Sequence, residues 1–144
     1  MKEDDQQETI VSDLYDNYHE TQKEVMAIEI RKTRNKLFTL AIFLFCVSMV
    51  ALFQMDAVTF QNVLIVSIEP ILFLGMGLLA IKEPMVAMLI TAIIIGGLWI
   101  YSAVQTNGVS LISGWILKVV VVYLVIAGIQ HAREAQRIRK ELKL

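Results

Sequence analysis

Four long apolar runs dominate the pattern of this chain, and short polar or charged segments separate them. The runs cover residues 37–53, 60–81, 85–104 and 109–129. A helix needs roughly 20 residues to cross the hydrocarbon core of a bilayer, and each run is close to that length. We therefore predict an all-α membrane protein with four transmembrane helices. Because the connecting segments are short, consecutive helices should pack as an antiparallel bundle.

Polar segments flank this apolar body and divide the chain into three regions. Residues 1–36 form an acidic arm that ends in a basic collar, residues 37–130 form the transmembrane bundle, and residues 131–144 form a basic helical tail. In the arm, one set of residues recurs at steps of three and four: Val11, Leu14, Tyr18, Thr21, Val25 and Ile28. This spacing predicts an amphipathic helix on the membrane or the tail, or a short coiled coil. Thr21 and Glu24 also fit a capping box, so one helix and a second helix starting at Thr21 both remain open.

The distribution of lysine and arginine predicts the orientation. These residues concentrate in the collar, at Lys82 and in the tail, whereas the loops at 54–59 and 105–108 contain none. Because basic flanks stay in the cytoplasm, both termini should be cytoplasmic. The arm is acidic, with nine acids and two lysines in residues 1–30. We expect it to attract the basic tail, through exposed pairs worth roughly 0–1 kcal/mol each that high salt should loosen.

Glu69 and Lys118 are the two ionisable residues that lie well inside the predicted spans. A charged side chain at a helix centre costs about 2.5–3.5 kcal/mol on insertion scales, so each should need a partner. Their depths in the second and fourth spans match, which makes them a candidate intramembrane polar pair. Pro70 cannot donate to the Val66 carbonyl, which should bend the helix and offer lysine a second acceptor. The pair could fix helix register or handle protons or ions; alternatively Lys118 reaches water by itself.

The remaining residues carry no recognisable catalytic chemistry. The chain has no phosphate-binding glycine loop, zinc-ligand pair or nucleophile motif, so we predict no catalytic residues, metal, cofactor or enzymatic activity. Cys46 lies in an apolar run and should be a small packed hydrophobe. His19 and His131 should be solvated helix residues. The predicted partners are the lipid bilayer and either another protein or a second copy, with no nucleic acid.

The C-terminal part of the chain shows a resemblance. Gly-Trp-Ile-Leu-Lys at 114–118, Gly-Ile-Gln-His-Ala-Arg-Glu-Ala at 128–135 and the basic end together resemble the tail of small four-span bacterial membrane proteins of unknown function. The resemblance covers about the last thirty residues and implies a bacterial cytoplasmic (inner) membrane. The layout is also similar to that of phage holins, which are short, multi-span and basic at the C-terminus.

Three functions follow as hypotheses. The first is a small non-enzymatic integral membrane protein that acts through protein partners, with the acidic arm and basic tail as interaction surfaces. The second is a small ion- or proton-coupled transporter or channel that uses Glu69 and Lys118. The third is a holin-like protein that forms membrane lesions.

Overall fold

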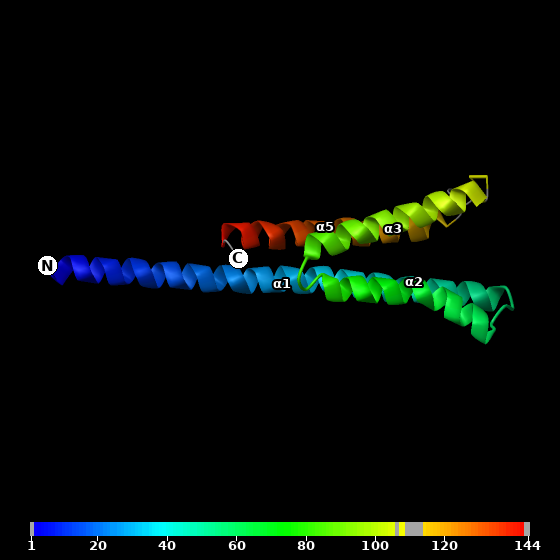
Figure 1. Cartoon of the computed structure of the whole chain (residues 1–144), viewed down its shortest axis with the longest axis horizontal. Coiled ribbons are helices and arrows are strands. Elements are labelled where there is room, and N and C mark those ends of the chain that lie inside the picture. The colour runs from blue at the N-terminus through cyan, green and yellow to red at the C-terminus, as the bar shows by residue number, and fades with distance from the viewer. Residues whose placement is uncertain (1, 106, 109–113, 143–144) are drawn as a thin grey trace.

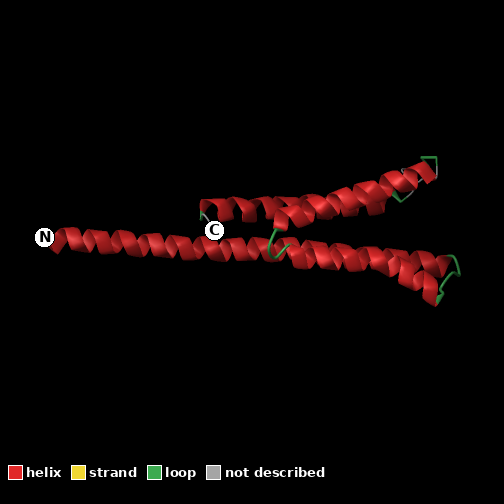
Figure 2. Cartoon of the chain, viewed as in Figure 1, coloured by secondary structure: helices red, strands yellow, loops and turns green. Residues whose placement is uncertain are grey.

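A computed structural model describes residues 2–105, 107–108 and 114–142, with side chains from residue 12 onward. These ranges contain four helices: α1 (Lys2–Gln54), α2 (Phe60–Leu79), α3 (Pro84–Gln105) and α5 (Trp115–Glu141). Figure 2 shows that helices make up nearly all of the described chain, with short loops between them. All four are long and apolar enough to cross a membrane, by length and composition. This confirms the prediction of an all-α chain with four helices of membrane-spanning length.

Local sequence signals explain most of the helix ends. Thr59 caps α2, because its hydroxyl accepts a hydrogen bond from the Asn62 backbone N–H at 3.3 Å. Pro84 is the first residue of α3, since its missing N–H costs nothing at that position. The fourth helix begins at Trp115 in the described structure, whereas its apolar run begins at residue 109. Residues 109–113 lie outside the described residues.

The arm, the collar and the first span form one continuous helix, α1. No glycine or proline occurs between residues 2 and 54, so the backbone has no breaker along this length. Thr21 does not start a second helix, and that alternative was wrong. Its hydroxyl instead donates to the Asn17 carbonyl at 2.8 Å, one turn earlier in the same helix. Figure 1 shows the blue N-terminal part of α1 projecting well beyond the C-terminal end of α5.

The helices pack in two pairs. α1 packs extensively on both α2 and α5. α3 packs on α5 and less closely on α2. Within the described chain, α2 and α5 make almost no contact. The core lies mainly toward the collar end, where Leu37, Phe73, Ala87, Met88 and Ala132 are nearly inaccessible. Toward the opposite end, the pair α1 and α2 diverges from the pair α3 and α5 (Figure 1).

Two glycines allow the closest helix approaches. A Cβ atom at Gly77 of α2 would overlap the ring of Phe38 on α1. A Cβ atom at Gly128 of α5 would overlap the thioether end of Met88 on α3. Small residues permit such approaches between membrane helices, where packing replaces the hydrophobic effect as the main source of association.

Candidate functional site

Glu69 lies in the interior of α2, about 13 Å from the start of the helix at 1.5 Å per residue. The residue is half-buried, and the next residue, Pro70, is buried against α1. α2 continues through Pro70 without interruption, and the Ser67 hydroxyl donates to the Val63 carbonyl at 2.7 Å. Figure 1 shows α2 bending away from α1 toward its N-terminal end, as a proline in a helix predicts.

Lys118 lies in the first turn of α5, where its backbone N–H donates to the Gly114 carbonyl at 3.2 Å. It is half-buried and has an interaction partner. Its Cα is about 4.5 Å along the helix axis from Trp115, the first residue of the described helix. A lysine this close to a helix end can extend its ammonium group to the membrane interface.

Glu69 and Lys118 sit on the two helices that are diagonally opposite in the bundle. α2 and α5 make almost no contact, and α1 and α3 lie between them. The ion pairs formed within the described ranges do not include one between these two residues. Their pairing therefore remains a prediction, and the described packing does not bring their helices together.

A polar junction between α1 and α5 was not foreseen from the sequence. Glu29 on α1 lies 2.6 Å from the His131 ring, Oε2 to Nδ1, and accepts from the Lys32 ammonium at 2.7 Å. The Thr33 hydroxyl is buried and donates to the Glu29 carbonyl at 3.0 Å. His131 is therefore not the solvated residue that the sequence predicted. The sequence placed His131 at the start of the tail, which was a signal that it could contact the arm. It could not identify Glu29 as the partner, because that contact depends on the register of the two helices.

The carboxylate of Glu29 is held in its charged form. Burial raises the pKa of Glu29, but hydrogen bonds from Lys32 and His131 and their positive charges outweigh it, so the pKa is lowered from 4.5. At neutral pH the ionised Glu29 carboxylate can only accept hydrogen bonds. The hydrogen bond between the two side chains is therefore donated by Nδ1–H of His131. The junction therefore joins arm and tail at the collar end of the apolar body.

The tail docks on the arm mainly through apolar side chains. Ala132, Ala135 and Ile138 are nearly inaccessible, at 0%, 1% and 3% exposure. Arg137 pairs instead within the tail, with Glu134 at 3.7 Å and Glu141 at 3.0 Å. The expected proximity of arm and tail is confirmed. Of the charge pairs expected between them, the described part of the chain contains one, the salt bridge between His131 and Glu29.

Two other side chains differ from expectation. Cys46 is exposed on α1 and is not packed in the core. His19 is half-buried beside Tyr15, with ring centroids 5.6 Å apart, and lines a cavity with Tyr18 and Glu141. Within the described ranges, no three histidine, cysteine or acidic side chains are grouped so that they could hold a metal ion.

The geometry defines a class of protein. Four helices long and apolar enough to span a bilayer, with apolar side chains exposed along them, fit a helical membrane protein. Comparison with protein-family models, curated proteins and solved structures finds no match for this chain.

Proposed function

We propose that this chain is a small non-enzymatic integral membrane protein that acts through a protein partner bound to its acidic arm. Its four spans would form an antiparallel bundle with both termini in the cytoplasm. The concentration of lysine and arginine in the collar, at Lys82 and in the tail, with none in the loops at 54–59 and 105–108, supports this orientation. Figure 1 supports it as well, because both chain ends lie toward the same end of the molecule.

Reporter fusions test this topology directly. Alkaline phosphatase fused at Asp56 or at Asn107 should be active, because both positions lie in loops that would face outward. A fluorescent cytoplasmic reporter should be active at Lys82 and after Leu144. A cytoplasmic reading at Asn107 would rule out four spans with both ends inside.

The single observation that carries the partner proposal is the exposed apolar face of α1 beside and beyond the C-terminal end of α5. The C-terminal end of α5 reaches the level of Tyr15 and Gln22, since these residues line one cavity with Leu142. The helix continues beyond that point toward Lys2 (Figure 1). Leu14, Tyr15 and Tyr18 keep 63%, 65% and 56% of their surface exposed.

Charge indicates the kind of partner. The exposed apolar side chains of this face are surrounded by the acids of residues 1–30. Two parallel copies of this helix would bring like charges together, which disfavours self-association through the heptad spacing. A partner that presents an amphipathic segment with basic flanks would match both the exposed apolar side chains and the negative charge of this part of α1.

Crosslinking in native membranes tests the proposal. Tagged full-length protein should yield a crosslinked product with a second protein, and Leu14→Ser with Tyr18→Ser should remove most of that product. Asn17→Ser is the matched control, because Asn17 is an exposed polar residue of the same helix. The crosslinked segment of the partner should be rich in lysine or arginine. Products containing two copies of this chain alone, or equal yields from all variants, would contradict the proposal.

A further inference from the structure

One face of α1 carries an arginine and also lines an apolar groove. Arg34, Phe38, Ala41 and Phe45 are spaced by four, three and four residues, so they lie on one side of the helix. This side faces α2, because Phe38 lies against Gly77 and Ala41 and Phe45 line a cavity shared with α2. Arg34 therefore lies on the collar side of the groove, about 10 Å along the helix from Ala41, with Phe38 between them.

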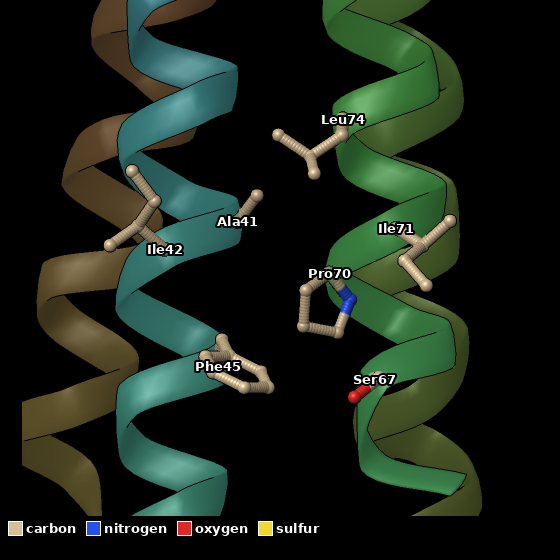
Figure 3. Close-up of a pocket in the computed structure, with 7 residues that line it drawn as sticks. All are labelled: Ala41, Ile42, Phe45, Ser67, Pro70, Ile71 and Leu74. Carbon is tan, nitrogen blue, oxygen red and sulfur yellow. The ribbon is translucent and has the colours of Figure 1, made fainter. Parts of the chain in front are cut away.

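The groove itself is suited to hydrocarbon. It has a volume of about 290 Å³, and Figure 3 shows Ala41 and Phe45 of α1 facing Pro70 and Leu74 of α2 across it. Ser67 is its one polar lining residue, and the Ser67 hydroxyl already donates to the Val63 carbonyl. An apolar chain could therefore lie here without leaving a polar group unsatisfied.

Arg34 has a buried donor without an acceptor in the described part of the chain. Its Nε is buried and has no hydrogen-bond partner, and its guanidinium lies 5.9 Å from the centroid of the Phe38 ring. Buried polar atoms in proteins nearly always have a partner. A guanidinium presents a planar fork of donors that matches the oxygens of a phosphate.

The nearby carboxylates do not supply that acceptor. Glu29 is engaged by Lys32 and His131, and Glu83 accepts from Arg139 at 3.3 Å. Within the described chain, neither Arg34 nor the neighbouring Arg31 has a carboxylate within 4.0 Å. The described residues therefore form no ion pair with either arginine. At the edge of a bilayer, the abundant anions are lipid phosphates.

We propose that Arg34 and the groove between α1 and α2 form a binding site for an anionic phospholipid. The phosphate of the headgroup accepts hydrogen bonds from the Arg34 guanidinium, and one acyl chain lies along Phe45, Pro70 and Leu74. This site uses the face of α1 turned toward α2, so it is independent of the partner proposed for the arm.

Native mass spectrometry of the full-length protein in detergent tests the site. Dioleoylphosphatidylglycerol should bind more tightly than dioleoylphosphatidylcholine, and Arg34→Gln should weaken the binding of the anionic lipid by about tenfold, the scale of one charge-assisted hydrogen bond. Arg31→Gln is the matched control, since it removes the same charge from an exposed arginine three residues away. That variant should bind within about twofold of the wild type.

Further ligands and a second variant of Arg34 distinguish a phospholipid site from a site that binds phosphate alone. Arg34→Lys keeps the charge, so its binding should fall between that of the wild type and that of Arg34→Gln. Dihexanoylphosphatidylglycerol, which has the same headgroup with short chains, should bind more weakly than the dioleoyl lipid, and glycerol phosphate should not compete. Equal binding of the two dioleoyl lipids would overturn the proposal. So would equal losses for Arg31→Gln and Arg34→Gln, or full competition by glycerol phosphate, which would indicate a phosphate site without a lipid chain.

Discussion

Replacing Gly77 with leucine is expected to separate α1 from α2 and to destabilise the folded protein by about 3 kcal/mol or more. Overpacking a filled interface typically costs about 1–3 kcal/mol, and here the new side chain meets the ring of Phe38 from its first atom. Gly77 is buried in the contact between the two helices, so the leucine cannot turn toward lipid. Unfolding in a titration with a denaturing detergent measures the loss.

Gly75 provides the matched control on the same helix. A Cβ atom there has no neighbour within 4 Å, so Gly75→Leu should leave stability within about 0.5 kcal/mol. Phe38→Ala should rescue Gly77→Leu in part, because it removes the ring that the leucine meets. The double variant should lose less than the two single losses added together. Equal losses at positions 75 and 77, or additive losses with Phe38→Ala, would show that this contact does not hold the helices together.

Ile138→Asp is expected to detach the tail from α1 while the membrane-spanning part of the bundle stays folded. Ile138 is 3% exposed, and α1 is the helix beside this end of α5 (Figure 1). An unpaired aspartate cannot stay buried there at acceptable cost, so the tail should move into water. Burial of an isoleucine contributes about 1.5–3 kcal/mol, so protection of the tail amides against hydrogen exchange should fall by about 10- to 100-fold.

Hydrogen exchange with mass spectrometry gives this result peptide by peptide. Gln130→Asp adds the same charge at an exposed position of the same helix and should leave tail protection unchanged. In the wild type, raising the salt to 1 M should not release the tail, because its buried contacts are apolar. Release of the wild-type tail by salt, or equal deprotection by both aspartates, would show that charge attraction holds the tail after all.

Several limits of the helices followed from the sequence, because they depend on local properties. Hydropathy sets the length of each span, Thr59 caps α2 through its own side chain, and Pro84 suits the first position of a helix, where its missing N–H costs nothing. The absence of glycine and proline from residues 2 to 54 was also visible, and it favoured the single long α1 over the capping box at Thr21. That capping box was misleading because Thr21 makes its hydrogen bond backward, to Asn17.

The partners of individual side chains could not be predicted in the same way. Glu69 and Lys118 were paired because they are the two ionisable residues well inside the spans and their depths match, but neither property says which helices are neighbours, and α2 and α5 lie diagonally across the bundle. Cys46 was placed in the core from an apolar run, but an apolar run in a membrane helix does not distinguish a packed face from a lipid-facing one.

By itself, the sequence determined four helices of spanning length, an acidic arm, a basic tail and the proximity of the two. The tertiary structure decided that Glu29 meets His131 and that Arg34 lies on the collar side of a groove. The physical reason is that helix formation depends on neighbours along the chain, whereas side-chain contacts depend on the register and rotation of packed helices. Register is set by close fits such as Phe38 against Gly77, in which both partners look like ordinary apolar residues in the sequence.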